Sequence, residues 1–177
     1  GIGIAVYLAV SHSREAPRAM GYDDVDARAA PDLALDDARG RTTRLSSLRG
    51  RPTLVHLWAT WCAPCRTELP SLLALDGATL GSARLRVVAV STDERWEPID
   101  AFFGRRVPPS VSRGGPVASR AYGVRTLPET FVLDDGGLLR ARMRGPRDWA
   151  SPEARAALAE LVGGWTVVRL QRGDQTS

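Results

Sequence analysis

Two cysteines separated by two residues carry the clearest chemistry in this sequence. Cys62 and Cys65 are the only cysteines of the 177-residue chain. Before them, 53–58 is apolar and typical of a buried strand, and after them 66–75 has leucines at helical spacing. The pair should therefore lie where a strand passes into the first turn of a helix, where free N–H groups and the helix dipole favour an anion. We expect Cys62 to ionise readily and Cys65, one turn later, to close a short disulfide with it.

The cysteine pair has two other interpretations, a structural disulfide and a zinc site. A disulfide between residues so close in sequence constrains little of the unfolded chain and stabilises weakly. A zinc site needs more ligands than these cysteines, and the only histidines, His12 and His56, lie far apart in the sequence. Redox chemistry is favoured, with no metal and no cofactor. Pro64 fits an early helical position, where a proline loses no hydrogen bond, and we expect it to tune the pair.

The residues around the pair resemble a known superfamily. The segment 56–70, HLWATWCAPCRTELP, resembles the thioredoxin superfamily, and its second half resembles the bacterial extracytoplasmic branch of TlpA-, ResA- and CcmG-like thiol–disulfide oxidoreductases. The resemblance covers about residues 32–162. It implies an α/β, thioredoxin-like fold in which helices flank a central mixed β-sheet. It also implies that Cys62 attacks a substrate disulfide and that Cys65 resolves the mixed disulfide.

A proline later in the chain matches the substrate-binding part of this superfamily. The superfamily places a cis proline opposite the two cysteines, and Pro128 matches that position. A proline has no N–H, and the backbone of the preceding Leu127 is left free to pair with an extended substrate. By this resemblance we expect Trp61, Leu127 and Pro128 to contact the substrate.

Two ionisable residues are candidates for handling the proton of Cys65. Glu68 lies three residues after Cys65, on the same face of the predicted helix, and matches a glutamate of the ResA-like pattern. Its negative charge would oppose thiolate formation, and it could relay a proton; the alternative is a solvated surface glutamate. His56 stands where thioredoxins place a buried aspartate, six residues before the first cysteine. It either takes over the proton role or, as we prefer, is a satisfied core histidine.

Strands and helices alternate along the rest of the chain. An N-terminal β-hairpin is predicted from 32–36 and 42–45, with its turn at 37–41. A second hairpin turns at 135–137 into a strand at 138–144. Further strands are predicted at 53–58, 85–91, 108–111 and 165–170, and helices at 66–75, 96–105, 117–122 and 151–162. Gly163 and Gly164 are expected to end the last helix.

The two ends of the chain are predicted to lie outside the folded domain. Residues 1–10 are apolar and uncharged but too short to cross a bilayer, which needs about twenty residues. We interpret them as the outer end of an N-terminal membrane anchor or signal segment. Residues 11–31 have no period and should form a tether, 32–163 the thioredoxin-like domain of the TlpA type, and 164–177 a tail.

Composition and the resemblance together define the expected function. The net charge of +4 is mild, and no basic run alternates with aromatic residues, so a nucleic-acid partner is not expected. The resemblance implies a membrane-tethered reductant of protein disulfides on the periplasmic side, recharged by a membrane electron donor of the DsbD/CcdA kind. GPRDW at 145–149 resembles TlpA-like proteins and PETF at 128–131 resembles CcmG, so the clients are cytochrome oxidase copper-centre assembly proteins or apocytochrome c.

Two other functions on the same fold fit less well. A copper-binding metallochaperone of the Sco kind would need a wider cysteine spacing and a histidine in the loop before Pro128, and the sequence has neither. A peroxiredoxin would place a threonine where this chain has Ala59. The metallochaperone remains the alternative to the oxidoreductase.

Overall fold

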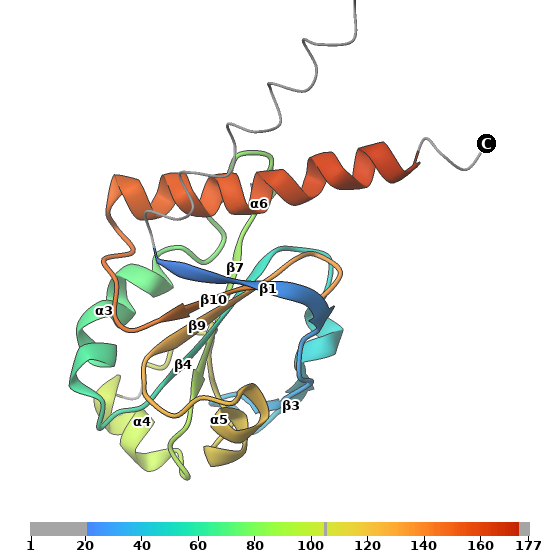
Figure 1. The fold of residues 1–177 in the computed structure, drawn as a ribbon. Coiled ribbons are helices and arrows are strands. Elements are labelled where there is room, and N and C mark those ends of the chain that lie inside the picture. The colour runs from blue at the N-terminus through green and yellow to red at the C-terminus, as the bar shows by residue number, and fades with distance from the viewer. Residues whose placement is uncertain (1–20, 105, 174–177) are drawn as a thin grey trace, which may run out of the picture.

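An eight-stranded mixed β-sheet forms the centre of the molecule (Figure 1). The computed structural model describes residues 21–104 and 106–173. The strands lie in the order β1-β10-β9-β4-β7-β8-β2-β3. β4, β7 and β8 pair in parallel and the other strand pairs are antiparallel, so the predicted α/β fold with a mixed sheet is confirmed. The bounds are β1 Tyr22–Ala29, β2 Ala34–Asp36, β3 Thr42–Arg44, β4 Thr53–Trp58, β7 Arg86–Ser91, β8 Val111–Arg113, β9 Glu129–Leu133 and β10 Leu138–Arg144.

Helices cover both faces of this sheet. Successive side chains of β4 point to opposite faces, so Leu54 and Trp58 join one buried cluster while Val55 and Leu57 join another. The first cluster packs against α3, α4 and α6, and the second against α5 and the 3-10 helix η2. The helices are η2 Leu45–Leu48, α3 Ala63–Leu73, α4 Glu97–Phe102, α5 Pro116–Tyr122 and α6 Pro152–Gly173. This arrangement fixes α3, and with it the cysteines, at the carboxyl end of β4.

The predicted N-terminal hairpin is present. β2 and β3 pair antiparallel, with Ala34 opposite Arg44. The Asp37 carboxylate accepts hydrogen bonds from the backbone N–H groups of Arg39 and Arg41, which holds the turn. A separate two-stranded ribbon is formed by β5 (Thr79–Leu80) and β6 (Ala83–Arg84).

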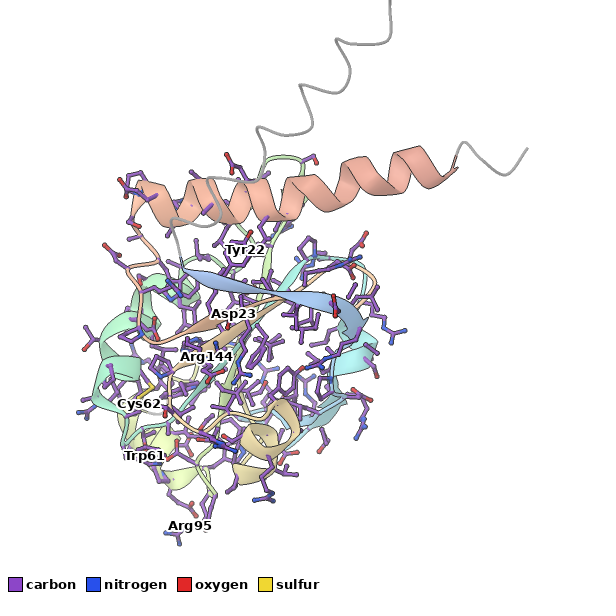
Figure 2. All side chains as sticks on the ribbon, in the orientation of Figure 1. Tyr22, Asp23, Trp61, Cys62, Arg95 and Arg144 are labelled. Atoms are coloured by element: carbon purple, nitrogen blue, oxygen red, sulfur yellow. A yellow bond between two sulfur atoms is a disulfide. The ribbon has the colours of Figure 1, made fainter. Side chains whose placement is uncertain are left out.

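The chain departs from expectation in the segment predicted to be a tether. The described part of 11–31 contains β1, which pairs antiparallel with β10 and extends the sheet by one strand. Tyr22 and Val25 pack against the two buried clusters, and Asp23 forms an ion pair with Arg144 (Figure 2). Backbone pairing with an open sheet edge therefore orders a polar sequence that has no apolar pattern of its own.

The last helix also differs from the prediction. Ser151 caps it as expected, accepting a hydrogen bond from the Ala154 N–H at 3.1 Å. However, α6 continues through Gly163 and Gly164 to Gly173, so the predicted strand at 165–170 is wrong. A glycine costs about 1 kcal/mol inside a helix, and this cost does not end α6, whose first half, with Ala156, Ala157 and Leu158, consists mostly of good helix formers.

The expected anchor, 1–10, lies outside the described residues. Among the helices of 21–104 and 106–173, none is both long enough and apolar enough to span a bilayer.

Candidate active site

Cys62 and Cys65 lie at the start of α3 and are joined by a disulfide (Figure 2). Cys62 is the N-cap residue, and its sulfur accepts a hydrogen bond from the backbone N–H of Cys65 at 3.3 Å. Pro64 occupies the first turn, where its missing N–H leaves no hydrogen bond broken. The sulfur of Cys62 thus faces the free N–H groups of a helix N-terminus, which favour negative charge there.

The two cysteines differ in their access to solvent. Trp61 is 71% exposed, Cys62 is 6% exposed and Cys65 is completely buried. A reagent or client approaching from solvent therefore reaches Cys62 first, while Cys65 can react with its neighbour from inside the protein.

A groove of about 590 Å³ runs beside Cys62. The start of α3 forms one wall with Trp61, Cys62 and Pro64, and the loop before β9 contributes Leu127. The peptide bond between Leu127 and Pro128 is cis, and Pro128 itself is buried. The structure thus brings Trp61, Cys62, Pro64 and Leu127 together at one groove, while Cys65 and Pro128 are buried and do not line it.

His56 is buried in the sheet on the face that carries α3. It lies on β4 opposite Thr130 of β9, and its Nδ1 is 2.9 Å from the Thr130 hydroxyl. Among the described residues its Nε2 has no hydrogen-bond partner, so the core histidine is satisfied on one side only. Burial lowers the pKa of His56 to about 3, which keeps the imidazole neutral at ordinary pH.

Glu68 faces His56 from α3 and is also buried. Its Oε2 accepts hydrogen bonds from the Arg147 backbone N–H at 2.8 Å and from Trp149 Nε1 at 2.9 Å. Its Oε1 lies 3.6 Å from His56 Nε2 and has no hydrogen-bond partner among the described residues. Burial raises the pKa of Glu68, and the bonds from Arg147 and Trp149 oppose that rise. The surface-glutamate interpretation is therefore wrong.

A second groove, of about 570 Å³, reaches Glu68 from solvent. Thr67, Pro70 and Ser71 of α3 form one side, and the segment 146–148 forms the other. The two grooves share Pro64 and have otherwise separate linings.

An aspartate that the sequence analysis did not single out holds the turn before the cysteines. Asp93 accepts hydrogen bonds from the Thr60 N–H at 2.9 Å, from the Thr60 hydroxyl at 2.8 Å and from the Ser91 hydroxyl at 2.6 Å. It follows β7, the parallel neighbour of β4, so both strands deliver their carboxyl ends to the same edge of the sheet. The prediction of two apolar parallel strands was the feature of the sequence that could have placed Asp93 near the turn before Cys62.

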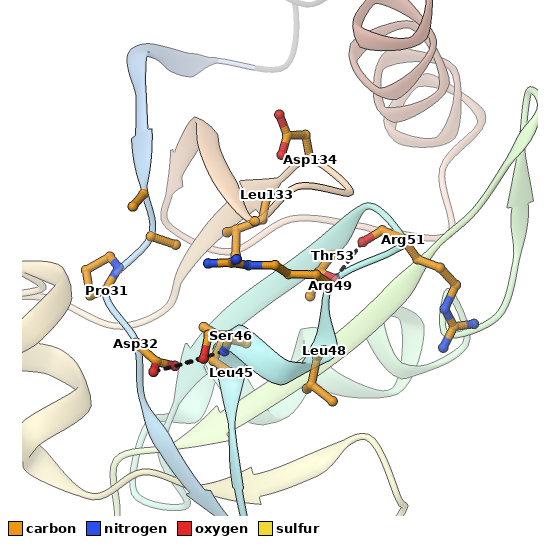
Figure 3. Close-up of a pocket in the computed structure, with 13 residues that line it drawn as sticks. Pro31, Asp32, Leu45, Ser46, Leu48, Arg49, Arg51, Thr53, Leu133 and Asp134 are labelled. Atoms are coloured by element: carbon orange, nitrogen blue, oxygen red, sulfur yellow. Dashed lines mark hydrogen bonds between the residues drawn. The ribbon is translucent and has the colours of Figure 1, made fainter. Parts of the chain in front are cut away.

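A pocket of about 350 Å³ at η2 is separate from this site (Figure 3). Asp32, Ser46, Arg49 and Asp134 are among the residues that line it, and neither cysteine does. We assign it no part in the thiol chemistry.

Comparisons with known proteins agree with this geometry. The model of the AhpC/TSA family matches residues 27–142. The chain belongs to this family. It is 34% identical to the thiol-disulfide oxidoreductase ResA of Geobacillus thermodenitrificans over 119 residues, 66% of this chain and 67% of that protein. It is 32% identical to the thioredoxin-like protein YneN of Bacillus subtilis, over 63% of this chain and 66% of that protein.

Solved structures show the same fold. A Chlorobium tepidum protein assigned as the thiol:disulfide interchange protein DsbE superposes with a TM-score of 0.61 at 26% identity, covering 78% of this chain and 96% of that one. As a member of the AhpC/TSA family with a Cys62–Cys65 pair on a thioredoxin-like fold, the protein is a thiol–disulfide oxidoreductase, as predicted.

Proposed function

We propose that this AhpC/TSA family member reduces disulfide bonds in other proteins through the Cys62–Cys65 couple. The observation that carries the proposal is the asymmetry of the pair, with Cys62 at a groove and Cys65 buried behind it. Cys62 attacks the client disulfide and forms a mixed disulfide, and Cys65 then cuts it. The groove, with exposed Trp61 and the backbone of Leu127, receives an extended segment of the client.

The proposed place of action is outside the cytoplasm, on the periplasmic side, with residues 1–10 as a membrane anchor. A membrane electron donor of the DsbD/CcdA kind would return the pair to the dithiol. Apocytochrome c and cytochrome oxidase copper-centre assembly proteins are the proposed clients. The resemblances at 128–131 and 145–149 and the similarity to ResA and DsbE support these proposals.

The Cys65→Ser variant tests the function by trapping the client. Serine is a poor nucleophile at neutral pH, so the mixed disulfide on Cys62 should persist until an external thiol is added. We expect bands on a non-reducing gel that disappear with reductant and that are missing for the matched Cys62→Ser variant. Trapping by Cys62→Ser alone would reverse the two roles. If neither variant captures a protein, a Cu(I) titration against a chelator decides whether the metallochaperone alternative replaces the oxidoreductase.

The reduction potential of the pair tests the direction of electron flow. Reductants of the thioredoxin type have reduction potentials of about −270 mV, and strong oxidants have reduction potentials of about −120 mV. We expect a value at the reducing end, measured by equilibration with glutathione. A value near the oxidising end would make the protein a disulfide donor.

A further inference from the structure

His56 and Glu68 present two buried polar atoms to each other that have no other partner in the described part of the chain. Nε2 and Oε1 are 3.6 Å apart, and neither has a hydrogen-bond partner among the described residues. The gap is about 0.5 Å longer than a good N–H···O bond and too short to hold a bridging water. A buried polar atom without a partner is costly, so the pair needs one hydrogen in this gap.

The other side of each group limits which hydrogen this is. Glu68 Oε2 already accepts from Arg147 and Trp149, so only Oε1 is available to take up or release a proton. His56 Nδ1 meets the hydroxyl of Thr130, which can either donate or accept. The histidine therefore has a partner that tolerates both of its neutral tautomers.

Two arrangements place one hydrogen in the gap, and they differ by one proton. When Glu68 is ionised, Nε2 carries the hydrogen and donates to Oε1, and Nδ1 accepts from Thr130. When Glu68 is protonated on Oε1, the carboxyl donates to Nε2, and Nδ1 carries the hydrogen and donates to Thr130. The imidazole is neutral in both, as its burial requires.

We propose that His56 is a positioning residue whose tautomer follows the protonation state of Glu68, so that the buried carboxyl has a hydrogen-bond partner before and after it takes up a proton. The inference rests on the proposed function only for the source of that proton. Other ionisable groups near the pair are few. Arg147 and Asp148 come from the segment after β10, and Cys65 comes from α3 itself. From the sheet, Thr130 of β9 and Ala89 of β7 flank His56, and neither is ionisable.

In the proposed reaction, Glu68 takes up and releases one proton for each client disulfide that is reduced. Glu68 lies three residues after Cys65 on α3, and in the mixed disulfide we take it as the acceptor of the Cys65 proton; the Cys65 thiolate then attacks the sulfur of Cys62. The Cys62–Cys65 bond forms, the bond from Cys62 to the client breaks, and the client sulfur leaves as a thiolate that water protonates. The dithiol is oxidised by two electrons and the client disulfide is reduced by two. Glu68 then releases its proton through the groove lined by Thr67.

Nitrogen NMR of histidine-labelled protein tests the tautomer directly. The chain has only two histidines, and a His12→Gln variant leaves His56 as the single signal. In the oxidised protein we expect the hydrogen to move from Nε2 to Nδ1 as the pH falls. The midpoint of this change should equal the midpoint of the titration seen in the carboxyl carbon signal of Glu68. Glu68→Gln should abolish the movement. Asp134→Asn, which changes another buried carboxylate paired with Arg140, should leave it intact. One tautomer at every pH while Glu68 titrates would overturn the proposal.

Kinetics separate positioning from a merely structural role. We expect His56→Leu to slow the cleavage of a preformed mixed disulfide by about tenfold, a small part of what positioned proton transfer contributes. His56→Gln should restore most of the rate, because the glutamine amide reaches the position of His56 Nε2 and can turn either its oxygen or its NH₂ toward the carboxyl. Equal rates for the Leu and Gln variants would count against the proposal, and the NMR result stands even if the Leu variant does not fold. A normal tautomer change in a protein without reductase activity would refute the proposed function instead.

Discussion

Trp61 leaves a large apolar ring in solvent directly beside the reactive cysteine. The ring is 71% exposed and lines the groove at Cys62. An exposed aromatic next to a binding groove is typical of a side chain that becomes covered by the partner.

Replacing this ring should slow the reduction of protein clients and not that of small-molecule disulfides. We expect Trp61→Ala to lower kcat/KM for a protein disulfide by about tenfold, equivalent to about 1.4 kcal/mol, and to leave the reduction of a small-molecule disulfide unchanged. Val117→Ala is the matched control, because Val117 is 54% exposed but is not among the residues that line the groove. An equal loss on both kinds of substrate would show that Trp61 acts on the cysteines and not on the client.

The buried carboxyl of Glu68 should make stability depend on pH. Its pKa is raised in the folded protein, so the folded state binds this proton more tightly than the unfolded chain. The contribution of Glu68 to stability therefore falls as the pH rises from about 4.3, the unfolded value, through the folded value. Glu68→Gln does not titrate, so its free energy of unfolding relative to the parent should increase over that range. The gain is about 1.4 kcal/mol for each pH unit between the two pKa values.

Urea denaturation of the oxidised protein across this pH range measures the effect. The control is Glu94→Gln, which changes an exposed carboxylate. This control shows how much of any change comes from removing a carboxylate at the surface. Parallel curves for Glu68→Gln and the parent would mean that the carboxyl has the same pKa in both states.

At the level of elements, the turn between β4 and α3 depends on β7. The Asp93 carboxylate accepts three hydrogen bonds, two of them from Thr60, and so ties the residues before Cys62 to the end of the neighbouring strand. Hydrogen bonds to a charged group contribute about 1.5–3 kcal/mol each, and they are not additive.

Asp93→Ala should therefore loosen the active-site turn as well as the fold. We expect the free energy of unfolding to fall by about 2–3 kcal/mol and client reduction to slow. Denaturant unfolding and a protein reduction assay, with Glu94→Ala as the neighbouring exposed control, measure both effects. A stability loss with full activity would show that the turn keeps its shape without Asp93.

Elements with strong periodic patterns could be predicted from the sequence. The apolar run of β4 and the alternation of β10 appear within a residue or two of their predicted bounds, as does the N-terminal hairpin. β1 could not be predicted, because Asp23, Asp24 and Asp26 interrupt any apolar pattern and its order comes from pairing with β10.

The site was predictable to the same extent. Cys62, Cys65 and Pro128 follow from local motifs, and the structure places Cys62 beside the loop that carries Pro128. His56 and Glu68 face each other through a tertiary contact between a strand and a helix, and residue spacing within either element does not reveal such a contact. Trp149, which completes the surroundings of Glu68, comes from a distant segment.

For the molecule as a whole, β1 is the edge strand at one end of the sheet, and its charged residues Asp23, Asp24 and Asp26 are of the kind that disfavour edge-to-edge pairing. It covers the free edge of β10 and packs Tyr22 and Val25 against the buried clusters. Unpaired strand edges favour association with other chains.

Removing β1 should destabilise the domain and expose that edge. We expect a variant that begins at Ala30 to lose about 2 kcal/mol or more of unfolding free energy and to self-associate, compared with a matched variant that begins at Gly21 and keeps β1. Urea denaturation and analytical ultracentrifugation measure the two effects. Identical behaviour of the two variants would show that β1 contributes neither to stability nor to protection against self-association.

The separate linings of the two grooves on either side of Pro64 have a consequence for turnover. A client that fills the groove at Cys62 leaves the groove at Glu68 open to water. We therefore expect water to keep access to the groove that Glu68 lines while the client is still covalently attached. If Glu68 exchanges its proton through this groove, we expect the pH of the surroundings to affect the rate at every degree of client saturation, and not only between one client and the next.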